Sequence, residues 1–225
     1  MPFRVAKLPE KKEPLTNYNK SLPQPINGAF RVLVCAQSGG GKTNLMINML
    51  LEMRKYFKKI VIFAPDLRQY IKHFKRKMTR HDQLYEGYEE AKVIVHYKKA
   101  VARNRQFPKK RTPTLFLFDD ALDELQRSRM FQELMVVSRK EHVSIIITAH
   151  KFTMATPLAR NNMTHFIVLS TNTMELRLIA SYLGVEADKL ISAWKHGPGS
   201  QRFEFLYIVA NPATVFYSFT DRRLM

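Results

Sequence analysis

One short segment of the chain has the composition and spacing of a phosphate-binding loop. Residues 36–43 read AQSGGGKT, which fits the P-loop pattern with alanine in its first position. Glycine has no Cβ atom, so several backbone N–H groups of such a loop can converge on the phosphates of a nucleotide. The alternative is a glycine-rich turn with an incidental lysine. The segment follows an apolar run and precedes a helical one, however, and this is the context that phosphate binding requires.

The residue types of this loop predict particular contacts with ATP and Mg²⁺. We expect Lys42 to reach the β and γ phosphates and the hydroxyl of Thr43 to be a ligand of the metal ion. The residues expected to surround the nucleotide phosphates are Gln37, Ser38, Gly39, Gly40, Gly41, Lys42, Thr43 and Asn44.

A second motif predicts the acidic part of the same site. Residues 115–120 read LFLFDD, an apolar strand that ends in acid, which is the Walker-B arrangement. We expect Asp119 to hold Mg²⁺ and Asp120 to orient or deprotonate the attacking water. An acid directly after the metal-binding one favours hydrolysis over phosphoryl transfer to a small molecule. The alternative explanation for either residue is that strands often end in aspartate for reasons of turn geometry.

A histidine and several arginines are further candidates for the chemistry. His150 ends the apolar run SIIITAH, where it could sense the γ-phosphate or could simply be a histidine satisfied at a strand end. An arginine from a neighbouring subunit often completes sites of this kind, and Arg139 and Arg160 are the main candidates. Arg127 and Arg129 are the second choice for this role. Arg139 is equally well explained as a cation near the C-terminus of a helix.

Apolar runs and helical periods alternate along the chain. We expect strands at 30–36, 59–63, 92–96, 114–118, 143–149 and 165–170. We expect helices at 44–56, 66–80, 122–140, 173–183 and 187–194, the fourth capped near Gly184, and a terminal hairpin from 203–209 and 214–219. This alternation predicts an α/β fold with a mostly parallel sheet flanked by helices and a C-terminal β-hairpin. With its two nucleotide motifs, the chain resembles a P-loop NTPase of the ASCE, RecA-like type. The strands that carry the two motifs should not be consecutive. Residues 28–225 should form one domain, preceded by a proline- and lysine-rich arm at 1–27.

The charge of the chain is strongly asymmetric. Of 37 lysines and arginines and 19 acids, 25 basic and 8 acidic side chains lie in residues 1–112, and the other half is nearly balanced. Basic clusters at 54–59, 72–80 and 98–111 predict a phosphate-rich partner that is bound without sequence preference and with strong salt dependence, although any single cluster could be a solvated face. The last cluster is free of acids and is expected to be a loop beside the strand of Asp119. Its candidate DNA-binding residues are Lys98, Lys99, Arg103, Arg105, Lys109, Lys110 and Arg111.

Composition also excludes several classes of protein. A single cysteine, Cys35, excludes a disulfide framework and zinc sites built from cysteine pairs. No apolar run reaches the length of a membrane span, and no signal peptide is visible at the N-terminus. We therefore expect a soluble protein of a reducing compartment that is not secreted and has no membrane partner.

Taken together, the strand–loop–helix with GGGKT, the LFLFDD strand and the segment SRKEHVSIIITAH resemble the viral genome-packaging ATPases of the FtsK–HerA superfamily. The nearest likeness is to those of nucleocytoplasmic large DNA viruses, virophages and related tailless double-stranded DNA viruses, and it covers residues 29–172. The resemblance implies the same roles for Lys42, Thr43, Asp119 and Asp120, and a polar sensor at His150. Superfamily members more often have Glu after the metal-binding Asp and Gln at the sensor position.

The resemblance further implies an ATP-driven motor that moves double-stranded DNA into a preformed capsid. It implies a homo-oligomeric ring of five or six subunits, contacts with capsid proteins, and a location at sites of virus assembly in the host cytoplasm or nucleus, or in the virion.

Other functions fit parts of the sequence. A helicase loader or a filamentous-phage assembly ATPase shares the nucleotide motifs, but a membrane-anchored assembly protein should show an apolar span. A partition-type ATPase would have an additional lysine within residues 37–40, which read QSGG. A small-molecule kinase could use the basic segments as a phosphate lid, and a nucleic-acid-binding protein could use the nucleotide only as a switch.

Overall fold

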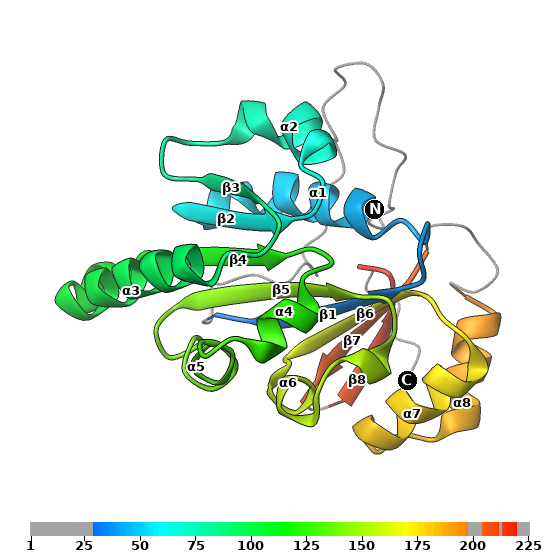
Figure 1. The fold of residues 1–225 in the computed structure, drawn as a ribbon. Coiled ribbons are helices and arrows are strands. Elements are labelled where there is room, and N and C mark those ends of the chain that lie inside the picture. Colours follow the sequence, from blue (N-terminus) through cyan, green and yellow to red (C-terminus); the bar gives the residue numbers. More distant parts are fainter. Residues whose placement is uncertain (1–28, 198–203, 212, 220–225) are drawn as a thin grey trace.

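The computed structural model describes residues 29–197, 204–211 and 213–219, so the predicted arm at 1–27 lies outside the described residues. Its centre is an eight-stranded sheet with the order β3-β2-β4-β5-β1-β6-β7-β8 (Figure 1). The strands are β1 (Arg31–Ala36), β2 (Lys59–Ala64), β3 (Gln83–Glu86), β4 (Thr114–Phe118), β5 (Val143–Ala149), β6 (His165–Ser170), β7 (Leu206–Ala210) and β8 (Ala213–Tyr217).

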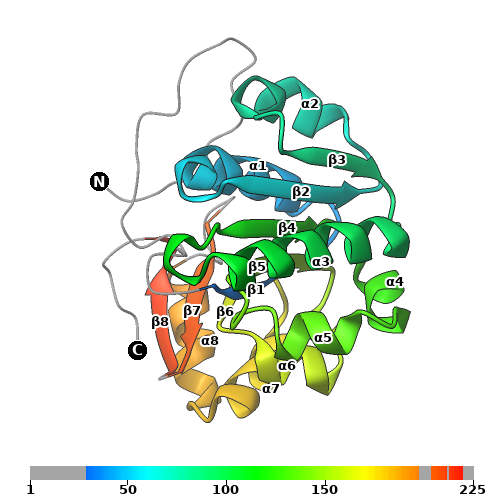
Figure 2. The ribbon, with the colours of Figure 1, turned by 90° about the vertical axis from the view of Figure 1, so that its left-hand side faces the viewer.

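The first six strands run parallel, and β7 and β8 form an antiparallel hairpin that continues the sheet beyond β6. Figure 2 shows this hairpin at one end of the twisted sheet and β2 and β3 at the other. The predicted α/β fold, the mostly parallel sheet and the C-terminal hairpin are confirmed.

Two layers of helices cover the sheet, which explains why its central strands are almost continuously apolar. The helices are α1 (Lys42–Met53), α2 (Arg68–Phe74), α3 (Glu90–Gln106), α4 (Leu122–Arg127), α5 (Phe131–Val136), α6 (Pro157–Asn162), α7 (Thr173–Leu183) and α8 (Ala187–Lys195). The apolar cluster on one face includes residues of α1 and α2, and the cluster on the other includes residues of α3 to α8. Every residue of β1, β4 and β5 is buried.

The order of the strands in the sheet decides which strand ends lie close together. β5 lies between β1 and β4, so the strand of the phosphate loop and the strand of the two aspartates are neither consecutive nor adjacent, as expected. Val34 of β1 pairs with Thr148 of β5, and Ile147 pairs with Phe118 of β4. Because all three strands are parallel, their carboxyl ends lie together at one edge of the sheet, which we call the carboxyl edge. The opposite edge, where these strands begin, is the amino edge.

Two expectations about the middle of the chain are wrong. Residues 92–96, predicted as a strand, and 97–112, predicted as a loop, instead form α3 up to Gln106. The buried residues of this helix, Val93, Tyr97, Ala100, Val101 and Asn104, follow a helical period and lie on one face. The run KVIVH has strand-like residue types, but packing of this face on the sheet overrides that preference.

The helix predicted over 66–80 and the one predicted over 122–140 are also divided differently. The first is α2 followed by a 3₁₀ turn at Lys75–Lys77, and the short strand β3 that comes next was not expected. The second is split into α4 and α5 because Ser128 has an extended backbone (φ −76°, ψ 150°), which a continuous helix cannot contain. The helices at 173–183 and 187–194 are confirmed, and Gly184 ends the former with a left-handed φ of 68°.

Candidate active site

The glycine-rich loop lies at the carboxyl edge, between β1 and the first turn of α1. Gly39 and Gly41 have φ values of 72° and 90°, in the left-handed region that side chains disfavour. Gly40 is restricted for a different reason. A Cβ atom there would lie 2.5 Å from the Ser170 hydroxyl and 2.9 Å from the Gln37 carbonyl oxygen. All three glycines are therefore needed to form this loop.

Lys42 stands at the centre of the site and joins three strand ends. It is 7% exposed, although it begins α1. Its Nζ donates to the carbonyl of Ala36, 3.0 Å away, lies 3.0 Å from Nδ1 of His150 and is 3.6 Å from Oδ1 of Asp120. The ammonium group is thus placed between the phosphate loop, the end of β4 and the end of β5.

Asp119 is the buried carboxylate of the site, with 4% exposure. Its Oδ2 accepts hydrogen bonds from Tyr70, at 2.7 Å, and from the Thr43 hydroxyl, at 3.3 Å, and its Oδ1 accepts one from Thr148, at 2.8 Å. Burial raises the pKa of Asp119, and the three donors oppose this effect because they stabilise the ionised form. Asp119 is therefore held in one orientation, and a nearby positive charge would stabilise its ionised form.

Asp120 is the carboxylate of the site that is exposed to solvent. Its backbone has a left-handed φ of 48°, and its N–H donates to the Thr148 hydroxyl at 2.9 Å. The side chain is 37% exposed and its Oδ1 faces both Lys42 and Nε2 of His150, the latter at 3.7 Å. Two neighbouring carboxylates in such different surroundings can divide two tasks, one binding a cation and the other acting on water.

The oxygen ligands of the site are of the kind that Mg²⁺ prefers. The Thr43 hydroxyl and the Asp119 carboxylate are hard donors 3.3 Å apart. In the described part of the chain, no group of three or more His, Cys, Asp or Glu could hold a metal ion without further ligands. A Mg²⁺ ion at this place would therefore depend on phosphate oxygens of the nucleotide, as is usual for this ion.

The candidate arginines do not join the site of their own chain. Nε of Arg139 donates to the carbonyl of Ala29 at the amino edge, 3.1 Å away, and not to a helix end. Arg160, on α6, lies with its guanidinium 5.2 Å from the ring centre of Phe152. The backbone N–H of Arg129 donates to Glu90. A role of Arg139 or Arg160 in the site of a neighbouring subunit stays a prediction.

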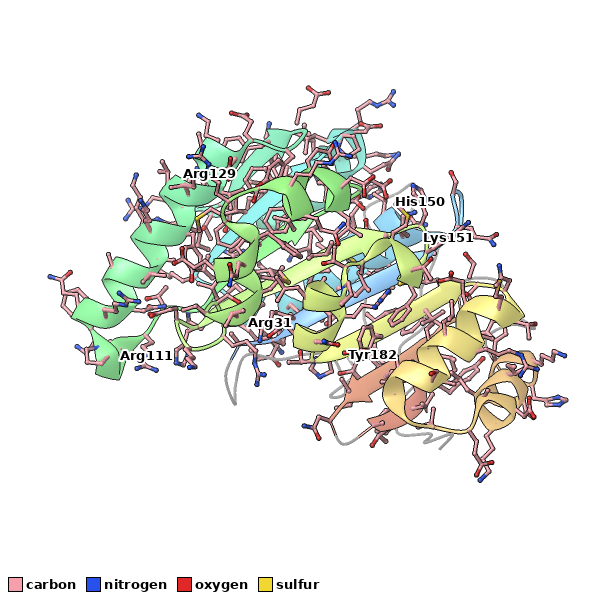
Figure 3. The ribbon with its side chains drawn as sticks, turned by 60° about the horizontal axis from the view of Figure 1, so that its bottom comes forward. Arg31, Arg111, Arg129, His150, Lys151 and Tyr182 are labelled. Carbon is pink, nitrogen blue, oxygen red and sulfur yellow. The ribbon has the colours of Figure 1, made fainter. Side chains whose placement is uncertain are left out.

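The predicted DNA-binding residues lie on the helix α3 and just after it, not on a loop. Lys98, Lys99 and Arg103 are exposed, while Arg105 forms an ion pair with Glu141 (2.5 Å). Lys110 and Arg111 follow the helix near the amino edge, and the side chain of Lys109 lies outside the described residues. In Figure 3 Arg111 lies near the left end of the molecule and His150, which is 3.7 Å from Asp120, lies towards the right, so the basic residues that follow α3 are away from the aspartates.

Three polar side chains of the site were not predicted. The Thr148 hydroxyl donates a hydrogen bond to Asp119 and accepts one from the N–H of Asp120. The Tyr70 hydroxyl donates to Asp119. The hydroxyl of Ser170 accepts from the N–H of Gln37 at 2.9 Å. Thr148 could have been noticed as a polar residue that follows three isoleucines in the run IIITA. Tyr70 lies in a basic segment whose sequence shows no sign of a role at this site.

Comparison with known proteins adds a family to this geometry. The model of the family described as Poxvirus A32 protein matches residues 18–215. The DNA packaging protein OPG160 of vaccinia virus (strain Copenhagen) is 29% identical over 143 residues, which is 61% of this chain and 52% of that protein. The monkeypox virus protein of the same name is also 29% identical over 143 residues, 61% of this chain and 46% of its own length. The chain thus spans about half the length of these curated relatives.

Solved structures share the fold. The DNA-packaging ATPase B204 of Sulfolobus turreted icosahedral virus superposes with a TM-score of 0.61 at 16% identity, over 86% of this chain and 98% of that one. The pCW3 conjugation coupling protein TcpA, solved with ATPγS, gives a TM-score of 0.54 at 14% identity, over 87% of this chain and 62% of its own. The predicted resemblance to viral genome-packaging ATPases is confirmed. Among the described residues, no helix has the length and apolar character of a membrane span.

Proposed function

The chain belongs to the Poxvirus A32 protein family, and from this premise we propose that it is an ATP-hydrolysing motor that moves double-stranded DNA, with the task of packaging a viral genome into a preformed capsid. The observation that carries the proposal is the convergence of Lys42, Thr43, Asp119 and Asp120 at the carboxyl edge of one sheet. Relatives named for DNA packaging support the biological task.

In this proposal the residues have separate roles. The backbone of residues 37–44 and the Lys42 ammonium bind the ATP phosphates, and the Thr43 hydroxyl and Asp119 hold Mg²⁺, which neutralises phosphate charge when bound. Asp120 orients the attacking water and accepts its proton. His150, which faces both Lys42 and Asp120, responds to the presence of the γ-phosphate. An arginine of the adjacent subunit, Arg139 or Arg160, completes the charge stabilisation.

The proposal extends to partners and place. The exposed lysines and arginines of α3 contact DNA phosphates without reading sequence. The subunits form a ring of five or six, and residues 28–225 act as the ATPase domain of each subunit. Capsid proteins bind the assembled motor. Such a protein works where virions assemble, in the host cytoplasm or nucleus.

The test is the rate of ATP hydrolysis with and without long double-stranded DNA, together with the oligomer mass in solution. We expect DNA to raise the rate, rising salt to reduce that stimulation steeply, and the mass to correspond to five or six chains. Hydrolysis that is indifferent to DNA, with phosphate transferred to a small acceptor, would identify a kinase instead. Nucleotide binding without turnover would identify a switch.

A further inference from the structure

A basic cavity lies at the amino edge of the sheet, away from the phosphate loop. It has a volume of about 330 Å³ and is lined by Arg54, Phe57, Lys58, Lys77, Thr79 and His81. These residues follow α1, precede β2, or connect α2 to β3, so they belong to the part of the fold between the two nucleotide motifs. We propose that this cavity is a second phosphate site, which binds a backbone phosphate of nucleic acid.

The floor of the cavity is held in place by an ion pair. Nη2 of Arg54 lies 3.1 Å from Oδ2 of Asp82, which is only 1% exposed. Oδ1 of Asp82 accepts from the N–H of Ile60 at 2.7 Å, and Oδ2 accepts from the N–H of Thr79 at 2.6 Å. Arg54 also donates to the carbonyls of Lys77 and Phe57. These bonds fasten the segment before β3 to the start of β2, so the cavity is formed before any ligand arrives.

The rim of the cavity has cations that these bonds do not use. Lys58 and Lys77 are both exposed, and within the described residues the side chain of neither makes a hydrogen bond or an ion pair. His81 stands beside them, and no acid lines the cavity. The carboxylate of Asp82 is already occupied by Arg54 and by backbone donors. Two unpaired ammonium groups above a fixed floor would gain most from an anion with several oxygens, such as a phosphate.

The surroundings favour a polymer over a single phosphate ion. The N–H of Lys58 donates to the carbonyl of Pro113 at 3.0 Å, which places the cavity next to the segment of Arg111. Nζ of the adjacent Lys59 lies 2.7 Å from Nδ1 of His96 on α3, so this helix comes close to the amino edge. The cavity therefore continues the basic surface of α3 around the amino edge. One free phosphate would neutralise only the cations of the cavity, whereas the backbone of a duplex could contact both the cavity and the basic surface of α3.

The identity of the polymer as double-stranded DNA rests on the proposed function, but the phosphate site itself does not require ATP hydrolysis. The variant Lys58→Gln/Lys77→Gln removes the two unpaired cations and leaves Arg54 and Asp82 intact. The matched control, Lys189→Gln/Lys195→Gln, removes the same charge from α8, which lies on the other side of the molecule from α2 (Figure 1).

The measurement is the affinity of each variant, made in the whole 225-residue chain, for a fluorescent 30-base-pair duplex over a range of salt concentrations. We expect the cavity variant to bind at least ~10-fold more weakly than wild type near 0.1 M salt, with a salt slope smaller by about 1 to 2, because each lost phosphate contact lowers the slope by about 0.9. The control should change affinity less than ~3-fold. Equal affinity and slope for the cavity variant and wild type would overturn the proposal.

Two further measurements separate the alternatives. Inorganic phosphate is added during thermal unfolding of wild type and variant. Stabilisation that disappears in the variant, combined with unchanged DNA affinity, would identify a site for free phosphate and contradict the nucleic-acid assignment. ATP hydrolysis without DNA is expected to match wild type in the cavity variant. A wild-type protein that binds DNA through these lysines but never hydrolyses ATP would refute the proposed motor while leaving this inference intact.

Discussion

The hydroxyl of Tyr70 donates a 2.7 Å hydrogen bond to Oδ2 of Asp119, across 49 positions of sequence. Tyr70 is fully buried, and burial together with the charge of Asp119 raises its pKa well above the ordinary value, so the phenol stays a donor. The helix that carries Tyr70 leads directly into the basic turn Lys75–Lys77. One short helix therefore connects the acidic centre of the site to a turn that lines the basic cavity.

The variant Tyr70→Phe keeps the ring and removes this donor. Because a donor that is hydrogen-bonded to a metal-binding carboxylate orients it, we expect the Mg²⁺ concentration for half-maximal ATP hydrolysis to rise about 10-fold or more. Loss of one buried hydrogen bond should also lower the free energy of unfolding by about 1 kcal/mol. Tyr182→Phe, which removes a hydroxyl bonded to the Arg160 carbonyl, is the control and should leave the Mg²⁺ dependence unchanged. An unchanged Mg²⁺ dependence in Tyr70→Phe would show that Asp119 does not need Tyr70.

The variant Asp120→Asn tests the solvent-exposed carboxylate. If Asp120 accepts a proton from water, kcat should fall by about 10² to 10⁴, while the affinity for a nonhydrolysable ATP analogue should change little. Asp123→Asn, on the exposed first turn of α4, is the matched control. Hydrolysis by Asp120→Asn at the wild-type rate would exclude this residue as the base.

The variant Gly40→Ala tests the shape of the loop. The new Cβ would lie 2.5 Å from the Ser170 hydroxyl and 2.9 Å from the carbonyl oxygen of Gln37, so the loop must shift. We expect nucleotide affinity to fall at least ~10-fold, as measured by calorimetry. Adding Ser170→Ala relieves the first clash but not the second and should restore binding only in part. Full binding by Gly40→Ala alone would mean that the loop closes differently around phosphate.

The basic face of α3 can be tested without disturbing the helix. Replacing Lys98, Lys99 and Arg103 by glutamine keeps good helix formers and removes three exposed charges. DNA affinity should fall at least ~10-fold with a smaller salt slope, and ATP affinity should be unchanged. Circular dichroism checks that the helix persists. Unchanged DNA affinity would remove α3 from the proposed DNA surface.

His165 should make stability depend on pH. Burial and then the charge of Arg139 lower its pKa to about 4, whereas an unfolded histidine titrates near 6.5. The unfolded chain therefore binds more protons between these values, so stability is full above pH 6.5 and is lost as pH falls towards 4, by about 3 kcal/mol in all.

The measurement is the difference in free energy of unfolding between wild type and His165→Gln across this range. The difference should shrink as pH falls, since the variant cannot be protonated there. His196→Gln, at an exposed position, should follow wild type. A parallel pH profile for wild type and His165→Gln would contradict the assignment.

Local patterns in the sequence were sufficient for the phosphate loop, the strand of the two aspartates and the alternation of elements. A loop such as residues 37–41 is dictated by which residues can adopt left-handed φ or tolerate close backbone approach, and glycine is the residue that does both. Strands buried on both faces, such as β4 and β5, appear as continuous apolar runs. Both signals are properties of a few neighbouring residues.

Residues 90–106 show where local preference failed. A short β-branched run such as KVIVH fits a strand and a buried helix face equally well, and only the packing of Val93, Tyr97 and Val101 against the sheet decided for the helix. The sequence by itself thus determined the identity of the nucleotide motifs and the α/β class. Tertiary structure decided that β5 lies between β1 and β4, which brings Thr148 to the two aspartates, and that β6 lies beside β1, which brings Ser170 to the phosphate loop. It also decided how α2 packs, which brings Tyr70 to Asp119. These contacts join residues far apart in the chain, so their existence depends on strand order and on helix packing, which no local pattern specifies.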